Sequence, residues 1–331
     1  MRRIVILLWL MLIVVCNASA QLRFNAEGKF KIVQFTDAHV RIDREDQMAK
    51  TVKRLRWIIQ EERPDLVVFT GDVVTGSPAL YAWRAILAPV AASNTPFVVV
   101  LGNHDLEEDL TAEQLADIIC AYPNSLNTKE SGRLDDLALE VASEDGERVE
   151  AIIYCLDSQD YSTDPNIEGY GWILEEQIEW YKERSRTYTE LNNGIPTPAY
   201  ALFHIPLPEY RTAVETQPKR VIGIHKEDIC APNYNSGMFE AMVECGDVNG
   251  IFVGHDHNNN FIVPYRGIAL CYGHFSGDQT VYNKLYSGVR IIELDRNGNF
   301  ETWIRDYRRR HRTKLRDHVL FDNQTSELLA K

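Results

Sequence analysis

Alternation between β-rich runs and helix-like segments across residues 30–121 limits the possible folds more than any other feature of this sequence. Short apolar runs rich in β-branched and aromatic side chains lie at residues 30–35, 66–69 and 97–101. After each run, apolar residues recur at helical spacing, within residues 45–62, 81–92 and 111–121. Strands that alternate with helices usually pair in parallel and are covered on both faces. The sequence therefore predicts an α/β fold.

The second half continues this theme less regularly. The expected strands lie at residues 151–156, 199–203, 251–253, 260–264, 268–272, 289–294 and 300–304. The expected helices lie at residues 172–189 and 234–244. A turn signal at residues 295–298 predicts that the last two strands form a hairpin. Residues 123–150 and 206–232 carry proline, glycine and charge, and we expect them to be loops or excursions around a site.

The start of the chain has the pattern of a secretory signal peptide. Two arginines precede an apolar run at residues 4–15, and residues 18–20 match the small-x-small cleavage pattern. We predict a signal peptide at residues 1–20, cleavage before Gln21, and a secreted or periplasmic protein. Lipoprotein anchoring at Cys16 is an alternative. No later stretch is long and apolar enough to cross a membrane.

Charge and composition narrow the class of partner. The 331-residue chain is 45% hydrophobic and 25% charged, with a net charge of −13, which is ordinary for a globular protein. Its field repels nucleic acid and anionic membranes, so we expect neither nucleic-acid binding nor stable membrane association. We interpret the basic stretch at residues 305–316 as a solvated segment. One domain is expected at residues 21–310, followed by a C-terminal tail at residues 311–331; the oligomeric state stays open.

The cysteines form neither a disulfide framework nor a metal knuckle. Five of the six lie outside the predicted leader and are scattered along the chain, at Cys120, Cys155, Cys230, Cys245 and Cys271. An odd number leaves at least one thiol unpaired within the chain, and the sequence assigns no bridge.

Potential metal ligands follow five of the expected strands directly. In chain order they are Asp37 and His39, Asp72, Asn103 with His104 and Asp105, His204, and His255 with Asp256 and His257. In open α/β sheets, ligands collect beyond the carboxyl ends of the strands. We therefore expect these side chains to meet at one edge of the fold.

The residue types suit a pair of metal ions. Carboxylate, imidazole and amide oxygen are ligands for borderline and hard cations, and the absence of thiolates argues against a structural zinc knuckle. Two cations about 3.5–4 Å apart can clamp a phosphoryl group and activate water. Holding them so close needs a bridging carboxylate, for which Asp72 is the natural candidate. The adjacent glycines Gly71, Gly102 and Gly254 allow tight turns and close backbone approach.

This set of motifs resembles the calcineurin-like metallophosphoesterase superfamily. The similarity rests on the ligand motifs above, in their order, and covers residues from about 30 to 305. The strings FHIPLPEY, GDV, GHDH and LCYG are also similar to the purple-acid-phosphatase-like branch of plants and microbes. The resemblance implies a four-layer αββα sandwich, in which helices flank two mixed β-sheets.

The resemblance also implies a role for each motif residue. The residues expected to bind the first metal are Asp37, His39 and His257. Those expected to bind the second are Asn103, His204 and His255, with Asp72 bridging the two. His104 would contact the phosphoryl oxygen or protonate the leaving oxygen, with Asp105 orienting its ring. A hydroxide bridging the metals would be the nucleophile.

Two positions depart from purple acid phosphatases. Thr75 stands where those enzymes have a metal-binding tyrosine, and His39 stands where they have glycine. We therefore expect no purple iron–tyrosinate colour. The identity of the two metal ions stays open among iron, manganese and zinc.

The expected function is metal-dependent hydrolysis of a small phosphorylated substrate, and phosphomonoesters are the expected substrate class. A phosphodiesterase of the same fold and an inactive metal-binding relative are the alternatives. His274 near the expected edge is either catalytic or a supporting group, and Asp256 is interpreted as a turn or supporting residue. Tyr161, Tyr170 and Trp172 either line a substrate cleft or pack internally.

Overall fold

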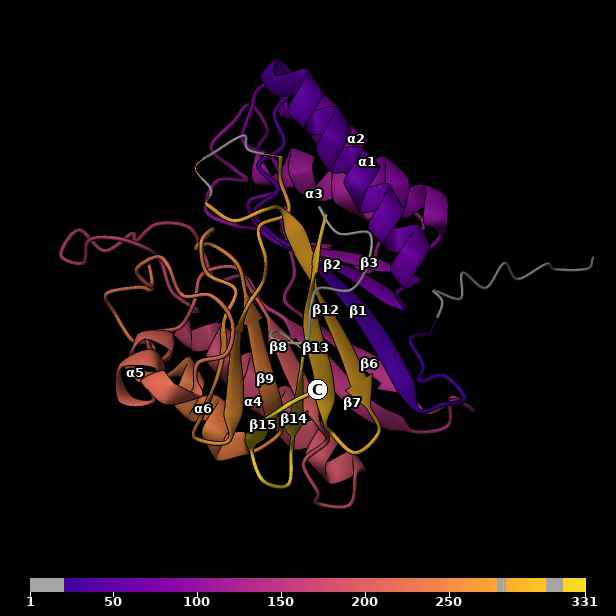
Figure 1. Ribbon diagram of the computed structural model, residues 1–331, viewed down its shortest axis with the longest axis vertical. Coiled ribbons are helices and arrows are strands. Elements are labelled where there is room, and N and C mark those ends of the chain that lie inside the picture. The colour runs from indigo at the N-terminus through magenta and orange to yellow at the C-terminus, as the bar shows by residue number, and fades with distance from the viewer. Residues whose placement is uncertain (1–20, 279–281, 283, 308–317) are drawn as a thin grey trace, which may run out of the picture.

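The computed structural model describes residues 21–278, 282, 284–307 and 318–331, and the α/β prediction is confirmed (Figure 1). The predicted signal peptide and Cys16 lie outside these residues, as does most of the basic stretch at residues 305–316. Within the described residues, no helix is long and apolar enough to span a membrane. The five described cysteines are all free.

One sheet contains the three predicted parallel strands. It has seven strands in the order β15-β14-β13-β12-β1-β2-β3. Their bounds are β1 (Lys29–Phe35), β2 (Leu66–Thr70), β3 (Phe97–Val100), β12 (Gly288–Asp295), β13 (Phe300–Asp306), β14 (Val319–Asp322) and β15 (Glu327–Ala330). β1, β2 and β3 pair in parallel, whereas the strands from β12 to β15 pair antiparallel. The predicted hairpin of β12 and β13 is confirmed.

The second sheet has six strands in the order β10-β11-β9-β8-β7-β6. Their bounds are β6 (Leu137–Ala142), β7 (Val149–Cys155), β8 (Ala199–Leu202), β9 (Val248–Val253), β10 (Ile262–Tyr265) and β11 (Ile268–Tyr272). β7, β8, β9 and β11 pair in parallel, and the edge strands β6 and β10 are antiparallel. A separate two-stranded ribbon joins β4 (Lys129–Glu130) to β5 (Arg133–Leu134).

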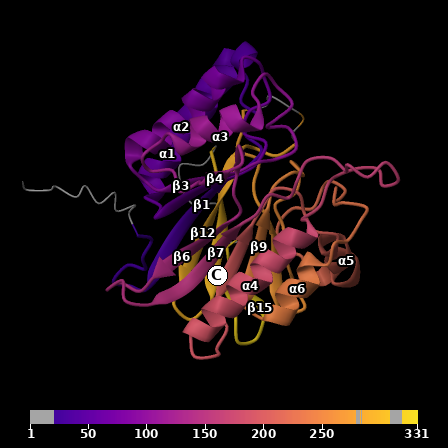
Figure 2. The ribbon, with the colours of Figure 1, turned by 180° about the vertical axis from the view of Figure 1, so that it is seen from behind.

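Helices cover the outer face of each sheet (Figures 1 and 2). The first sheet carries α1 (Glu45–Glu62), α2 (Ala79–Ser93) and α3 (Ala112–Cys120), with the short 3-10 helix η1 (Ile42–Arg44) before α1. The second carries α4 (Glu175–Leu191), α5 (Glu209–Thr216) and α6 (Met238–Cys245), with the 3-10 helix η2 (Pro218–Arg220) after α5.

Three hydrophobic clusters define four layers. The middle cluster combines both sheets, because alternate side chains of each strand point inward; Ile32 of β1 and Phe252 of β9 belong to it. Val33 of β1 points the other way, into a cluster with α1, α2 and α3. Ile251 of β9 likewise points outward, into a cluster with α4, α5 and α6. The expected αββα sandwich is therefore present.

Several expected loops contain regular structure. Residues 123–150 include β4, β5 and β6, and residues 206–232 include α5 and η2, so their assignment as loops was wrong in part. β6 forms because its antiparallel pairing with β7 buries Leu137 and Val141 against the middle cluster. The charged residues on either side of β6 hid this strand, whose formation depends on pairing with β7.

The C-terminal region also differs from the sequence-based interpretation. The residues expected as a tail include β14 and β15, because β13 offers an edge with which β14 can pair. At the start of the basic stretch, Arg305 is buried instead of solvated: its Nε lies 3.2 Å from Glu62 Oε1. Its guanidinium also lies over the Trp57 ring, at 5.3 Å from the centroid.

Candidate metal centre

The predicted ligands meet where strands from both sheets end. Asp37, Asp72 and Asn103 follow β1, β2 and β3, while His204 and His255 follow β8 and β9. All of the predicted ligands are buried. The structure brings six side chains together from four strand ends: Asp37, His39, Asp72, His204, His255 and His257. Asn103, at the fifth strand end, precedes His104, whose backbone N–H donates to Asp72 Oδ1.

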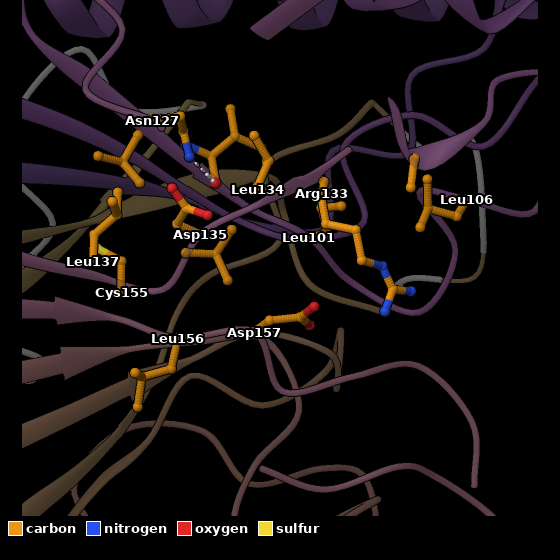
Figure 3. A pocket seen from close by; sticks show the side chains of 14 residues that line it. Leu101, Leu106, Asn127, Arg133, Leu134, Asp135, Leu137, Cys155, Leu156 and Asp157 are labelled. Atoms are coloured by element: carbon orange, nitrogen blue, oxygen red, sulfur yellow. Dashed lines mark hydrogen bonds between the residues drawn. The ribbon is translucent and has the colours of Figure 1, made fainter. Parts of the chain in front are cut away.

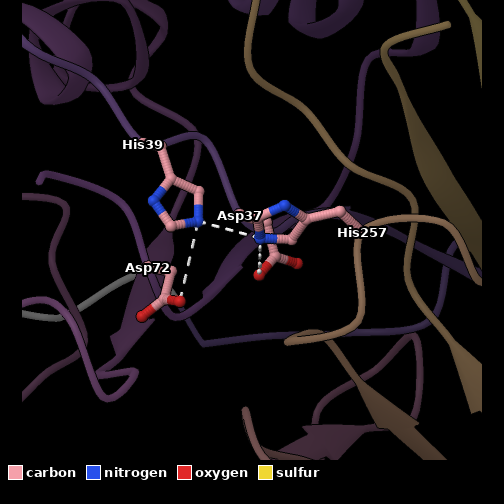
Figure 4. A group of neighbouring side chains, drawn as sticks. All are labelled: Asp37, His39, Asp72 and His257. Carbon is pink, nitrogen blue, oxygen red and sulfur yellow. Dashed lines mark hydrogen bonds and ion pairs between the residues drawn. The ribbon is translucent and has the colours of Figure 1, made fainter. Parts of the chain in front are cut away.

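Four of these side chains form the first group (Figure 4). Nε2 of His39 lies 3.0 Å from Nε2 of His257 and 3.6 Å from Oδ2 of Asp72. Nε2 of His257 lies 3.6 Å from Oδ1 of Asp37. Their potential ligand atoms all lie within 4.8 Å of one another, which is close enough to hold one ion.

The second group shares Asp72 with the first. It consists of Asp72, His204 and His255, whose ligand atoms again lie within 4.8 Å of one another. Nε2 of His204 lies 3.2 Å from Oδ2 of Asp72 and 3.3 Å from Nδ1 of His255. One carboxylate therefore belongs to both groups, which is the arrangement that a bridging ligand requires.

Backbone carbonyls fix two of the imidazoles. Nδ1 of His204 donates to the carbonyl oxygen of Thr70 at 2.8 Å, and Nδ1 of His257 donates to that of Tyr282 at 3.0 Å. A carbonyl only accepts, so the proton of each neutral ring lies on Nδ1. Both rings therefore present the Nε2 lone pair to the site, as histidine ligands to metals do. No motif or spacing in the sequence pointed to Tyr282.

The donor set fits cations. Oδ1 of Asn103 is buried without a hydrogen-bond partner, although buried polar atoms are nearly always paired. The lone pair of His204 Nε2 faces a carboxylate oxygen of Asp72. The Nε2 atoms of His39 and His257 likewise face each other. Facing acceptors repel one another unless a cation or a proton lies between them. These residues therefore suit two metal ions, although nothing in their geometry selects among iron, manganese and zinc.

The charges of the buried rings support this interpretation. Burial lowers the pKa of His39 to about 3 and that of His255 well below its ordinary value, so both rings are neutral near pH 7. Burial opposes charge on His204 too, but the carboxylates of Asp72 and Asp37 outweigh it and raise its pKa to about 10. Without a metal, His204 is therefore protonated, and the proton on its Nε2 lies between the ring and Asp72, where a metal ion would otherwise lie.

The backbone at these strand ends adopts unusual conformations. Four of the clustered residues have positive φ angles: Asp37 (52°), His39 (42°), Asp72 (52°) and His255 (79°). Residues other than glycine rarely adopt this region, and strain of this kind concentrates at functional sites. Gly254 also lies so close to Thr36 that an added Cβ would come within 1.9 Å of its hydroxyl oxygen. Close approach of the two sheets at the site therefore requires glycine there.

His104 lies beside the clustered ligands but outside both groups. Its backbone N–H donates to Oδ1 of Asp72 at 2.9 Å, and its ring centroid lies 5.7 Å from that of His39. Its Nδ1 contacts Oε2 of Glu107 at 2.6 Å. The side chain is partly exposed, so a substrate can reach it.

The expected role of Asp105 was wrong. Its carboxylate does not contact the His104 ring, and instead accepts backbone N–H bonds from Gly102, Asp72, Val73 and Val74 at 2.8–3.1 Å. The short, buried side chain of Asp105 is close enough to accept from the backbone N–H groups of the turn after β2. Asp105 therefore holds Asp72 in place, and Glu107 is the residue that contacts His104.

Other candidates have supporting positions. Asp256 accepts a hydrogen bond from the Tyr272 hydroxyl at 2.5 Å and another from the backbone of Cys230 at 3.2 Å, in agreement with the predicted turn or supporting role. His274 contacts Asn260 and the carbonyl oxygen of Tyr286, and it belongs to neither ligand group.

Aromatic side chains surround the centre. The Tyr170 ring meets the His255 ring edge-on at 4.3 Å, and Tyr161 stacks on Tyr170 at 5.9 Å. Tyr282 stacks on the His257 ring at 4.4 Å. The sequence pointed to Tyr161 and Tyr170, but it did not separate packing from cleft lining.

A separate small cavity lies near the ends of β3 and β7 (Figure 3). Apolar side chains such as Leu101, Leu134 and Leu156 line much of it, and its volume is about 30 Å³. That space holds about one water molecule and no organic substrate. None of the seven predicted ligands lines this cavity, so it is not part of the metal centre.

Comparison with known proteins agrees with this geometry. The model of the calcineurin-like phosphoesterase family matches residues 30–259. The chain is 32% identical to the probable inactive purple acid phosphatase 29 of Arabidopsis thaliana, over 94% of this chain and 90% of that protein. It is also 32% identical to the phosphatase DCR2 of Saccharomyces cerevisiae, over 87% of this chain but only 56% of the yeast protein.

A solved structure shares the fold. The dimetal phosphatase from Danio rerio superposes with a TM-score of 0.54 at 14% identity, covering 84% of this chain and 96% of that one. The family model covers most of the chain, and the solved structure shares its fold. The chain therefore belongs to the calcineurin-like phosphoesterase family.

Proposed function

We propose that this protein hydrolyses phosphate esters at a dinuclear metal centre, with phosphomonoesters as the preferred class. The observation that carries the proposal is Asp72, whose carboxylate belongs to both groups of buried ligands. In this scheme Asp37, His39 and His257 hold one ion, Asn103, His204 and His255 hold the other, and Asp72 bridges them. Two bound cations would supply Lewis acidity toward a phosphoryl oxygen and an activated water as nucleophile.

The protein side chains then bind, orient and protonate. His104 lies next to Asp72 and is partly exposed, so it can contact a phosphoryl oxygen or give a proton to the leaving oxygen. The buried ligands exclude bulk water, which strengthens electrostatic interactions at the centre. No side chain of the cluster is needed as a covalent nucleophile.

An inactive relative is the second candidate. The name of the Arabidopsis relative describes it as a probable inactive phosphatase, whereas the yeast relative is named a phosphatase. Activity in this chain is supported by the six clustered ligands, by the unpartnered oxygen of Asn103 and by His104 beside Asp72. A phosphodiesterase would use the same centre, so the ligand set alone does not separate it from a phosphomonoesterase.

Turnover with metal analysis tests the proposal. Metal-free protein, prepared with a chelator, should be inactive toward p-nitrophenyl phosphate, and added Mn²⁺, Zn²⁺ or iron should restore turnover. Bis-p-nitrophenyl phosphate should be the slower substrate if monoesters are preferred. A His204→Ala variant purified in parallel controls for contaminating phosphatases. The proposal would be overturned if the metal-free protein were as active as the metal-loaded protein. It would also be overturned if protein with two bound metal ions showed no turnover.

We also propose that the protein is exported and acts on small phosphorylated molecules outside the cytoplasm. The support is the signal-peptide pattern at residues 1–20, together with the net charge of −13, which disfavours nucleic acid as a ligand. N-terminal sequencing of protein recovered from an expressing culture should give Gln21 as the first residue. An intact leader, or a lipid on Cys16, would contradict this cleavage site.

A further inference from the structure

A chain of hydrogen bonds joins Asn103 to His104 through two side chains outside the family motifs. The Asn103 Nδ2 donates to the Tyr161 hydroxyl at 3.2 Å, and that hydroxyl donates to Oε1 of Glu107 at 3.0 Å. The other carboxylate oxygen, Oε2, lies 2.6 Å from Nδ1 of His104. The chain therefore connects a candidate metal ligand with the candidate catalytic imidazole.

The carboxylate at the centre of this chain sets the direction of every bond. Ionised Glu107 only accepts, so the Tyr161 hydroxyl must donate to it and can accept from Asn103. The amide of Asn103 must then turn its NH₂ group toward Tyr161. Its oxygen is left on the opposite side, where it is buried without a partner. The same carboxylate accepts a hydrogen bond from the Nδ1–H of His104, which leaves Nε2 as the nitrogen free to act on a substrate.

Contacts other than those of its hydroxyl also hold Tyr161, which is 44% exposed. Its ring stacks on Tyr170 at 5.9 Å, and Tyr170 meets the His255 ring at 4.3 Å. Its backbone N–H donates to Oδ1 of Asp160 at 2.7 Å. The segment that carries Tyr161 follows β7 of the second sheet, whereas Asn103 and Glu107 follow β3 of the first. Removing only the hydroxyl should therefore break the hydrogen bonds and keep the ring.

We propose that Tyr161 and Glu107 are positioning residues of this centre. Tyr161 fixes the amide of Asn103 so that its oxygen faces the metal site, and Glu107 fixes the ring of His104. The part that concerns His104 rests on the proposed hydrolytic function. The part that concerns Asn103 depends only on metal binding.

The variant Tyr161→Phe tests the metal part. We expect it to bind one of two metal ions about 10–100-fold more weakly, the usual cost of losing a group that orients a ligand. The measurement is competition titration with Zn²⁺ and a chromophoric chelator, with stoichiometry from elemental analysis. Tyr188→Phe is the matched control. Tyr188 lies on α4, outside the metal centre, and its hydroxyl donates to Glu140 of β6 at 3.1 Å. Tyr161→Phe that binds two ions as tightly as wild type would overturn the assignment.

The variant Glu107→Gln tests the catalytic part. At saturating metal, kcat should fall about tenfold or more with KM little changed, because the lost contact orients His104. Glu107 also accepts from the Tyr161 hydroxyl, so the variant should bind metal no more weakly than Tyr161→Phe does. The loss should be greater for an alkyl phosphate than for p-nitrophenyl phosphate. Equal kcat in wild type and Glu107→Gln would exclude the role of Glu107. Wild-type protein without turnover would refute the hydrolytic function, and the Zn²⁺ titration of Tyr161→Phe would still decide the role of Tyr161.

Discussion

The Nδ1–H of His204 donates a hydrogen bond to the carbonyl oxygen of Thr70 at 2.8 Å, and this directs Nε2 at Asp72. Thr70 and Asp72 are two residues apart in the chain. The end of β2 therefore supplies both the shared carboxylate and the acceptor that orients a ligand from the second sheet. An added Cβ at Gly71, between them, would lie 2.5 Å from His204 Nδ1. The two sheets are thus joined at the centre by one strand end.

Replacing Asp72 with asparagine should weaken both metal sites. A neutral amide no longer offsets two cations, and Asp72 is the residue common to both ligand groups. We expect at least about tenfold weaker binding of each ion, measured by elemental analysis after dialysis against limiting chelator. Asp145→Asn, at an exposed position, should keep the wild-type metal content. Two tightly held ions in Asp72→Asn would contradict the bridging role.

His104→Ala should retain most of the bound metal and lose most of the turnover. A positioned acid typically contributes about 10²–10⁴-fold, and His104 lies outside both ligand groups. The loss should be larger for an alkyl phosphate, whose leaving oxygen needs a proton, than for p-nitrophenyl phosphate. Equal losses for the two substrates would instead indicate that His104 only stabilises the phosphoryl oxygens.

The metal content of the same variants tests the ligand assignment. Asn103→Ala should lose part of the bound metal, because it removes the amide oxygen that lies buried without a partner. If His104→Ala loses an ion and Asn103→Ala keeps both, the assignment of the two neighbouring residues is wrong.

Asp105→Ala should lower the stability of the fold. It would leave four backbone N–H groups, of Gly102, Asp72, Val73 and Val74, without their acceptor. Unsatisfied buried donors cost about 1–3 kcal/mol each, so we expect a loss of at least about 3 kcal/mol in the free energy of unfolding. Urea unfolding in excess chelator measures this without the contribution of bound metal. Asp145→Ala, at an exposed position, should lose less than about 1 kcal/mol.

Asp136 should make the stability of the protein depend on pH. Burial raises its pKa from 3.8 to about 6, although the backbone of Asp157 and the amide of Gln177 donate to it. Between these two pH values the folded state holds a proton that the unfolded state has lost, so stability falls as pH rises toward 6. Allowing for its partial exposure, the effect is about 2 kcal/mol.

Asp136→Asn removes that titration. Its free energy of unfolding, relative to wild type, should therefore be higher at pH 7 than at pH 4. Urea unfolding of both proteins at both pH values measures the difference, and any offset that does not depend on pH cancels. A relative stability that is the same at pH 4 and pH 7 would show that folding does not shift the pKa of Asp136.

The fold class and the clustering of candidate ligands could be predicted because both depend on local sequence. Apolar periodicity identified β1, β2 and β3 with the helices after them, and each clustered ligand follows a strand within a few residues. Residues such as His204 are far from the other ligands in the chain, but the rule that strand ends share an edge brings them together. The strands β6 and β14 were missed, because their pairing partners rather than their own composition make them strands.

The sequence by itself determined which side chains are available for metal binding and in what order the strands present them. Only the tertiary structure decided their orientation. Asp105 holds the backbone of Asp72, and Glu107 contacts His104, although the family resemblance implied that Asp105 would orient the His104 ring. Tyr161 reaches Asn103 from the other sheet. Hydrogen bonds of this kind depend on distances of a few tenths of an ångström between segments far apart in the chain, and a linear pattern does not contain those distances.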